Sequence, residues 1–204
     1  MKLLSAVMAL LPLATASLHL RQDTDSAVQV TDLNAVGPGC PAHGVRKDLK
    51  TNGTEDATVE FDTYESVLRA GAGDAQRDVH CQVFVTLKFP AGCTSATLST
   101  TYRGRATVAD GATGALAPSY RLQGGQLDVT IPEPTFFEGA EYKGGKDYER
   151  TDEVVAKVDG EKEGEVQFVI RSRTFVQTTN GEGAGEGSVT SDDISVSVKS
   201  SEGC

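Results

Sequence analysis

Apolar and polar side chains alternate along much of the chain, which is the pattern of strands with one buried face. In residues 79–89 every second residue is apolar and the residues between them are polar, with Phe84 as the single exception. Successive side chains of a strand point to opposite faces of a sheet, so this period of two predicts a long, half-buried strand. Residues 165–177 alternate in the same way, although their apolar face weakens to Ser172 and Thr174.

Glycine-rich and Asn-Gly turn signals separate these runs at short intervals, and no segment has a convincing helical period. The pattern therefore predicts an all-β fold, which we interpret as an antiparallel β-sandwich of about eight to ten strands stapled by disulfides. A two-layered fold suits such a chain because it leaves few strand edges uncovered. Further strands are expected at residues 27–33, 57–64, 94–109, 119–123, 126–131, 153–158 and 188–199.

The first residues have a different pattern, typical of a secretory signal peptide. Lys2 supplies the positive start, residues 3–13 form an apolar run, and residues 14–16 fit the small-x-small cleavage pattern. A membrane helix needs roughly 20 apolar residues, about twice this run, so no membrane span is expected. We predict a secreted, extracellular protein. Its expected parts are a signal peptide (1–16), an N-terminal segment with the first strand (17–36) and a single β-sandwich domain (37–204).

Composition adds that the chain is acidic, with 19 Lys+Arg against 29 Asp+Glu and a formal net charge of −10 over 204 residues. Such a charge repels phosphate backbones and anionic lipid surfaces, so nucleic acid is not an expected partner. The acidic residues are concentrated between Glu133 and Glu165. We interpret this stretch mainly as a solvated face, and a surface for cations or a basic partner is the alternative.

Four cysteines in a secreted chain of this size predict two disulfides and no free thiol. Cys81 begins a strand that ends at Phe89, and at about 3.3 Å per residue the two ends lie nearly 30 Å apart. Because bridged Cα atoms lie within about 7 Å of each other, a bridge from Cys81 to Cys93 is disfavoured. Cys40 then pairs with either Cys81 or Cys93, and Cys204 takes the cysteine that remains.

The chain has one N-glycosylation sequon, Asn52-Gly53-Thr54. Its Asn-Gly pair also favours a turn, which places the acceptor nitrogen of Asn52 at the surface. We therefore expect Asn52 to be open to glycosylation during secretion.

Several spaced motifs resemble a known secreted family. In order along the chain they are Gly37-Pro38-Gly39-Cys40-Pro41, TVEFDTY at 58–64, CQVFVTLKFPAG at 81–92, Tyr102-Arg103-Gly104, GATG at 111–114 and Ser119-Tyr120. Together they are similar to the mainly fungal family known as domain of unknown function 4360, and the resemblance covers residues 37–124 best. It implies a secreted protein and assigns no catalytic residue.

The cysteines depart from that family's pattern. Its members place a third cysteine in a Pro-Cys-Gly turn of the second half, where this chain has Val158-Asp159-Gly160. Cys93 in turn stands where the family usually has an aromatic residue. The resemblance therefore implies that one disulfide is re-routed, and the family's connectivity does not carry over.

Familiar catalytic and metal-binding motifs are missing from the sequence. It has no Gly-x-Ser-x-Gly elbow, no His-Glu-x-x-His, no Cys-x-x-Cys and no phosphate-binding glycine loop, so we predict no cofactor, no metal and no catalytic residue. His80 lies on the polar face of the clearest strand. Catalysis by His80 would need a carboxylate such as Glu60 or Asp62 beside it. We interpret His80 as an exposed strand residue.

Four aromatic residues outside the long strands form the candidate surface-binding site: Phe136, Phe137, Tyr142 and Tyr148. Flat aromatic faces beside acidic residues suit a sugar ligand. A loop that plugs an apolar sheet end is the alternative, and we favour it because loops commonly shield such edges.

The sequence thus favours a secreted, non-enzymatic, monomeric β-sandwich that acts by surface binding, as an effector or at a cell wall. Its expected partner is an extracellular protein or glycan. One alternative is a carbohydrate-active enzyme or glycan-binding module that uses the acids near residues 133–153. Another is an inhibitor of secreted hydrolases that inserts the disulfide-pinned loop at residues 37–41.

Overall fold

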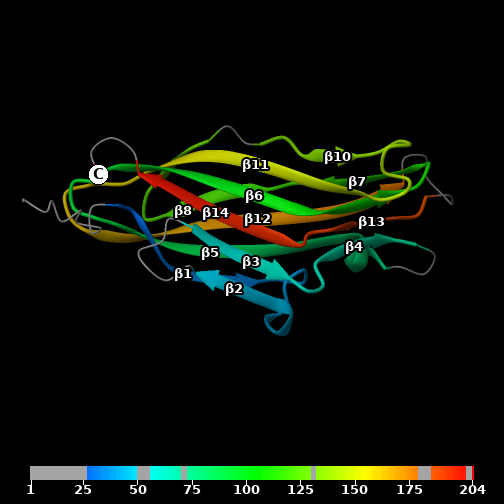
Figure 1. Cartoon of the computed structure of the whole chain (residues 1–204), viewed down its shortest axis with the longest axis horizontal. Helices are drawn as coiled ribbons and strands as arrows, with labels where there is room; N and C mark the ends of the chain where they lie inside the picture. Colours follow the sequence, from blue (N-terminus) through cyan, green and yellow to red (C-terminus); the bar gives the residue numbers. More distant parts are fainter. Residues whose placement is uncertain (1–26, 50–55, 70–72, 130–131, 179–184, 201–203) are drawn as a thin grey trace, which may run out of the picture.

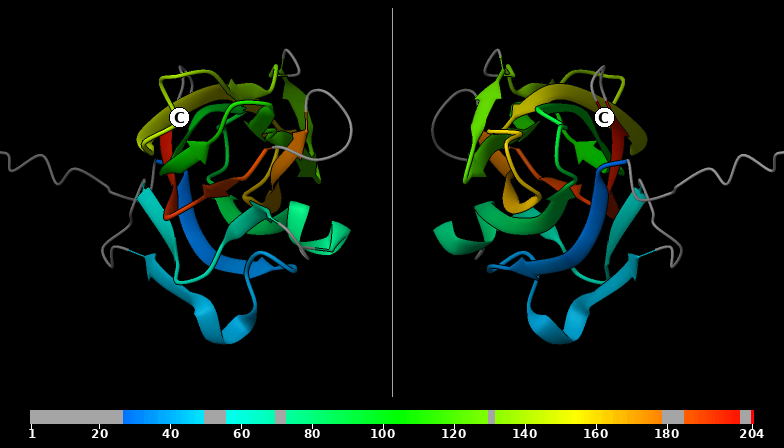
Figure 2. Two further views of the ribbon diagram at one scale, coloured as in Figure 1. Left: turned by 90° about the vertical axis from the view of Figure 1, so that its right-hand side faces the viewer. Right: turned by 90° about the vertical axis from the view of Figure 1, so that its left-hand side faces the viewer.

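The computed structural model describes residues 27–49, 56–69, 73–129, 132–178, 185–200 and 204. Its strands run along the long axis of the molecule in two antiparallel sheets (Figure 1). Viewed along that axis, the sheets curve around a common interior (Figure 2). The predicted all-β, disulfide-stapled antiparallel fold is confirmed. The predicted signal peptide (1–16) and the sequon at Asn52 lie outside the described residues.

The first sheet, which we name sheet A, is built around two long central strands. These two strands pair along most of their length, and short strands complete both edges. In spatial order sheet A contains β1 (Gln29–Val36), β5 (Asp78–Phe89), β12 (Gly164–Thr178), β7 (Ala112–Leu116) and β10 (Thr135–Phe137), with β8 (Ser119–Gln123) also paired to β12.

The second sheet, named sheet B, is built around β6 (Ser95–Val108). It contains β2 (Val45–Leu49), β3 (Asp56–Phe61), β14 (Asp193–Ser200), β6, β11 (Lys146–Lys157) and β9 (Gln126–Asp128) in that order, and β13 (Gly187–Thr190) joins β6 to β4 (Glu65–Leu68). Two short helical turns complete the described elements, the 3-10 turn Ala42–Gly44 and α1 (Asp74–Arg77).

The inner faces of both sheets form one hydrophobic core. On β5 the six residues that the alternation assigns to the buried face are at most 6% exposed, whereas Phe84 stands on the outer face and is half-buried. Ser172 of β12 is fully buried, where its side-chain and backbone oxygens accept from the Tyr64 hydroxyl at 3.1 and 2.7 Å. The apolar pattern of β12 is therefore weak at Ser172 because the core is polar at this point.

Fourteen strands lie in the described residues, rather than eight to ten. The expected strand 188–199 is divided into β13 and β14 at Ser191 and Asp192. Four strands were not expected, because each is short or lacks alternation: β2, β4, β7 and β10.

Two disulfides fasten the chain to this frame. Cys40 is bonded to Cys81 and Cys93 to Cys204, one of the two arrangements that the sequence left open. The bonded cysteines are 41 and 111 positions apart. Loops of that order make each bond worth about 4 kcal/mol when the entropy of the unfolded chain dominates.

One edge of β12 is covered by two strands with a break between them. β8 pairs with Gln167–Arg171 and β7 with Thr174–Thr178. Pro118 lies in the break and has no N–H to donate, so the ladder cannot continue through it. Only the Ala117 amide bridges the break, donating to the Arg173 carbonyl at 2.8 Å.

Candidate binding site

An open hollow of about 660 Å³ lies on the outer face of sheet A, over the break between β7 and β8. Its floor is formed by the outward side chains of β5 and β12, namely Asp78, His80, Arg171 and Arg173. Ser119 and the rings of Pro118, Pro132 and Pro134 line the rest. We name this site the basic hollow, because it holds two arginines on a chain whose formal charge is −10.

The register between β5 and β12 brings these side chains together. Arg173 is opposite His80, and Arg171 is opposite Ser119 of β8. Directly opposed residues of antiparallel strands hold their Cβ atoms about 5 Å apart. The polar groups of the basic hollow therefore come from rigid, hydrogen-bonded strands and are positioned before any ligand arrives.

Arg173 is already engaged by a carboxylate. Its Nε and Nη2 donate to the two carboxylate oxygens of Asp78 at 2.8 and 2.5 Å, and its guanidinium lies 5.0 Å from the ring centroid of Phe175. The hydrogen bonds from Arg173 hold the pKa of the Asp78 carboxyl below its ordinary value. Both side chains are about 45% exposed, so the pair contributes at most about 1 kcal/mol to stability.

Arg171 is in a different state from Arg173. It is exposed and makes no ion pair with any residue that the structure describes. It interacts electrostatically with Asp78, whose charge Arg173 already compensates. The basic hollow therefore presents one uncompensated guanidinium, next to the half-buried imidazole of His80.

The proline wall of the basic hollow is fastened to sheet B by a network of partly buried polar groups. Arg150 of β11 donates from Nη1 to the Glu133 carbonyl and to Thr135 Oγ1, at 2.7 Å each. Its Nε donates to Asp152 Oδ1 at 2.9 Å, and the two side chains are only 14% and 13% exposed. The residues on both sides of Pro134 are thus held from the sheet-B side, Glu133 by its backbone and Thr135 by its side chain.

Two tyrosines complete this network across the gap between the sheets. The Tyr120 hydroxyl of β8 donates to Asp152 Oδ2 at 2.6 Å, and the Tyr102 and Tyr120 hydroxyl oxygens lie 2.8 Å apart. Burial raises the pKa of both tyrosines well above the ordinary value, so both remain protonated donors. The hydroxyl chain therefore links β6, β8 and β11 into one rigid support.

The structure separates the four predicted aromatic residues. Phe137 is fully buried, with its ring centroid 5.3 Å from that of Tyr142 and 4.8 Å from that of Tyr148. These three rings pack together, with Phe137 on β10, Tyr148 on β11 and Tyr142 in the loop between the two strands. Phe136 points the other way, is 52% exposed, and lies in one cross-strand row with Ala115 and Phe175 on the outer face of sheet A.

The other candidates of the sequence lie elsewhere. Glu60 and Asp62 both pair with Arg46 of sheet B at 3.3 Å, so Asp78 is the carboxylate that accompanies His80. The loop 37–41 does not project, because the Gly39 amide donates to the His80 carbonyl at 3.0 Å and Cys40 is 1% exposed.

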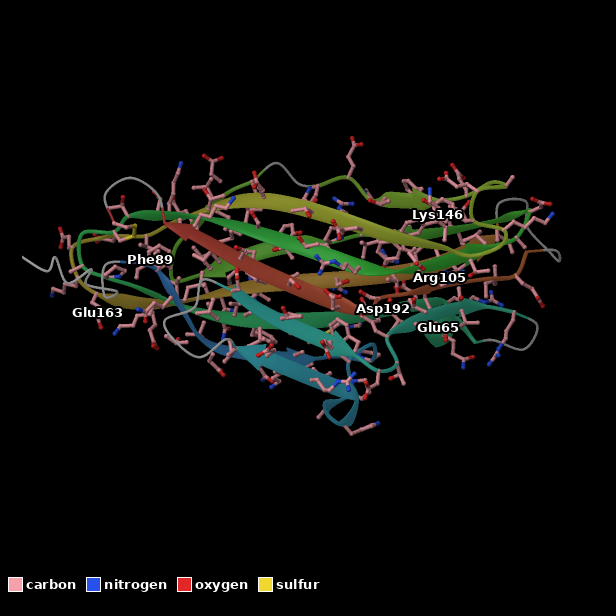
Figure 3. The ribbon with its side chains drawn as sticks, in the orientation of Figure 1. Glu65, Phe89, Arg105, Lys146, Glu163 and Asp192 are labelled. Carbon is pink, nitrogen blue, oxygen red and sulfur yellow. A yellow bond between two sulfur atoms is a disulfide. The ribbon has the colours of Figure 1, made fainter. Side chains whose placement is uncertain are left out.

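Besides Asp152, three of the acids near residues 133–153 pair with basic side chains, at different places. Glu141 pairs with Lys146, Asp147 with Arg105 at 2.7 Å and Glu149 with Arg103 at 2.8 Å. Figure 3 labels Arg105 and Lys146 toward the same end of the sandwich. No group of three metal-binding side chains occurs in the part of the chain that the structure describes, and none of its helices is long and apolar enough to span a membrane.

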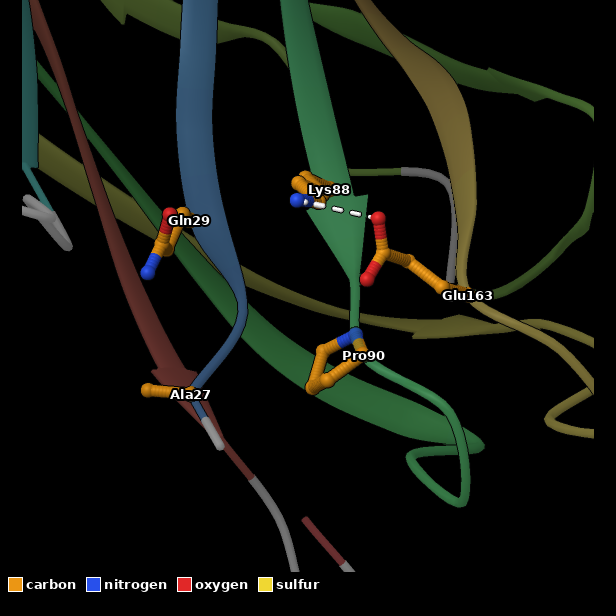
Figure 4. Close-up of a pocket in the computed structure, with 5 residues that line it drawn as sticks. All are labelled: Ala27, Gln29, Lys88, Pro90 and Glu163. Carbon is orange, nitrogen blue, oxygen red and sulfur yellow. Dashed lines mark ion pairs between the residues drawn. The ribbon is translucent and has the colours of Figure 1, made fainter. Parts of the chain in front are cut away.

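Two smaller hollows offer less to a ligand. One, of about 150 Å³, lies between the start of β1 and the end of β5, where Lys88 pairs with Glu163 at 2.9 Å (Figure 4). The other, of about 210 Å³, lies on the outer face of sheet B among hydroxyl groups of β3, β6 and β14. Neither contains an arginine side chain, so the basic hollow is the stronger site for a charged ligand.

In comparison with known proteins, residues 26–202 match a family model described as Domain of unknown function (DUF4360). A curated relative, an uncharacterized secreted protein of Arthroderma benhamiae, is 26% identical over 109 residues. That match spans 53% of this chain and 44% of the relative, so the chain covers less than half of the relative's length. A solved structure, TmCBM61 in complex with beta-1,4-galactotriose, covers 84% of this chain and 91% of its own at 11% identity, and its TM-score of 0.24 carries no argument.

Proposed function

The chain belongs to the Domain of unknown function (DUF4360) family, and from this premise we propose that it is a secreted, non-enzymatic binding protein. Its binding surface is the outer face of sheet A. The observation that carries the proposal is the basic hollow, where an uncompensated Arg171 lies on the same face as the exposed ring of Phe136. Exposed aromatic and arginine side chains are the residue types that dominate binding surfaces.

Secretion is supported from three directions. Residues 1–16 have a pattern typical of a signal peptide, a curated relative is a secreted fungal protein, and both pairs of cysteines form disulfides. Disulfides persist in oxidising compartments such as the extracellular space. We accordingly take residues 17–204 as the mature protein, which acts as a monomer at a cell wall or on an external target.

Binding, rather than turnover, is supported by the state of the polar groups. Two carboxylates of the candidate site and its support, Asp78 and Asp152, are each held by an arginine. A general acid or a nucleophile must instead be free to exchange protons or attack. A rigid face whose groups are already positioned binds with a small loss of conformational entropy.

The test is retention of ligands on the immobilised, oxidised mature domain, offered a panel of extracellular polysaccharides and proteins. We expect a ligand that wild type retains and that the double variant Arg171→Gln with Phe136→Ala loses. Lys199→Gln, at an exposed position on the other sheet, is the matched control and should bind as wild type does. Equal binding by the double variant would refute the proposal, and so would turnover that a single carboxylate substitution abolishes.

A further inference from the structure

We propose that the ligand of this face is an acidic polysaccharide. A uronate carboxylate binds Arg171 in the basic hollow, and another sugar ring of the same chain packs on Phe136. This inference rests on the proposed function and adds the chemical class of its ligand. It follows from charge, from the spacing of the two side chains and from the kind of surface that surrounds them.

The charge of the basic hollow selects an anion. Arg173 and Asp78 neutralise each other, which leaves Arg171 as the uncompensated charge on the floor. A guanidinium binds a carboxylate through two parallel hydrogen bonds, and this geometry makes it selective for planar anions. Ser119, opposite Arg171 on β8, adds a hydroxyl that can donate to the same ligand.

The distance between the two contact points requires a ligand of several linked units. Arg171 precedes Phe175 by four residues on β12, which is about 13 Å along a strand. Phe136 stands two strands across from Phe175, about 10 Å in the perpendicular direction. The two side chains are therefore about 16 Å apart by this strand geometry, more than one sugar ring can bridge. A single uronic acid fills only the basic hollow.

The surface between the two points suits sugar rings better than a peptide. The strands under the basic hollow, β5 and β12, have hydrogen-bonded neighbours on either side, and the Ala117 amide occupies the break between β7 and β8, so the hollow itself offers no free strand edge to an incoming peptide backbone. The rings of Pro132 and Pro134 and the face of Phe136 instead present flat apolar surfaces, which match the C–H faces of a pyranose.

The negative charge of the whole protein does not prevent this binding. At physiological ionic strength the Debye length is about 8 Å, so distant carboxylates are largely screened from a ligand seated in the basic hollow. Arg171 acts at contact distance and is screened much less. A nucleic acid, with a charge at every phosphate along a rigid backbone, extends beyond the hollow and meets the acidic surface. A polyuronate also carries one charge per unit, but that charge is a planar carboxylate, which a guanidinium binds through two parallel hydrogen bonds.

The test uses oligogalacturonates of increasing length, their methyl esters and neutral galacto-oligomers, titrated into the oxidised mature domain by calorimetry. We expect affinity to rise from the monomer to oligomers that span both points, and to fall about tenfold or more on esterification. Arg171→Gln should weaken acidic oligomers about 10- to 100-fold. Phe136→Ala should weaken acidic oligomers about 2- to 10-fold. Lys199→Gln is the control.

The outcomes separate this inference from the proposed function. If neutral and acidic oligomers bind equally and only Phe136→Ala weakens them, the acidic class is wrong and the face remains a binding surface. A second outcome is that poly-glutamate binds more tightly than any oligogalacturonate and loses that binding in Arg171→Gln. This result would show that the ligand is not a polysaccharide, while the outer face of sheet A would remain the binding surface. If a ligand binds and neither substitution affects it, both proposals fail. The inference is supported if Arg171→Gln, and not Phe136→Ala, loses the preference for acidic over neutral oligomers.

Discussion

Phe136 and Phe137 are sequence neighbours on opposite faces of β10, so their alanine variants form a matched pair. Phe137 is 0% exposed and Phe136 is 52% exposed. We expect Phe137→Ala to lower the free energy of unfolding by about 3–5 kcal/mol, as for other buried aromatic truncations. Phe136→Ala should change it by no more than about 0.5 kcal/mol, the usual range at the surface.

The expected cost of Phe137→Ala follows from what its ring touches. A phenylalanine buries roughly 150–250 Å², and at about 25 cal/mol per Å² its full burial is worth about 4–6 kcal/mol, of which alanine keeps a part. The ring contacts to Tyr142 and Tyr148 are lost as well. The cavity cannot collapse easily, because the backbones of both ring neighbours are fixed. Tyr148 lies in the β11–β6 ladder, and the Tyr142 carbonyl accepts from the Val108 amide at 3.0 Å.

Urea unfolding of the oxidised mature variants, followed by far-ultraviolet circular dichroism, measures the difference. The chain has no tryptophan, so fluorescence is a weaker probe. The free energy of unfolding must fall with urea concentration at the same slope in both variants before their midpoints are compared. A cost below about 1 kcal/mol for Phe137→Ala, or equal costs for the two variants, would refute the assignment of Phe137 to the core.

Three further perturbations test other parts of the fold. Replacing Cys93 and Cys204 together by alanine should lower the free energy of unfolding by about 3–5 kcal/mol, and an unchanged urea midpoint would contradict the bond. Gly39→Ala should cost about 1–3 kcal/mol, because a Cβ there would lie 2.5 Å from the buried ring of Tyr64; a neutral effect would contradict this packing. Burial raises the pKa of the Asp192 carboxyl, so its ionised form opposes folding. Asp192→Asn should therefore stabilise slightly at neutral pH, with the gain disappearing in acid, and a gain that grows as pH falls would contradict that sign.

The long strands could be predicted because their sequences alternate and one face of each enters the core. The predicted strands 79–89, 94–109 and 165–177 agree within one residue with β5, β6 and β12. β7 could not be found in this way, since all five of its residues are buried and Thr113 is its single polar residue. Its outward side is covered by neighbouring chain segments, which local periodicity does not record.

The start of β11 was missed for a different reason. The expected strand began at Glu153, whereas β11 begins at Lys146. In the missing half the side chains of Arg150 and Asp152 are polar yet largely buried. They are tolerated because each is hydrogen-bonded, an arrangement that requires partners distant in sequence. Alternation between apolar and polar residues cannot reveal a strand whose buried face is ionic.

The candidate site could be predicted only in part. His80 was recognised as a polar residue on the best strand, but its carboxylate neighbour was sought at Glu60 or Asp62. That carboxylate is Asp78 of the same strand, β5. The arginine that pairs with it, Arg173 of β12, is 95 positions away and meets it only through the β5–β12 register. A usable signal was present: Arg171 and Arg173 are both on the polar side of an alternating strand in an acidic chain.

The site and the stability of the fold depend on the same short segment. Pro118 interrupts the strand beside β12, and Pro132 and Pro134, in the segment that leads into β10, line the hollow at this break. Within this segment Phe137 is fixed in the core, while Pro134 and Phe136 face outward. Pro134 and Phe136 are therefore held in place, because Phe137 beside them cannot move without opening a cavity in the core. A ligand that binds them has little ordering left to impose, which is the condition under which few contacts give useful affinity.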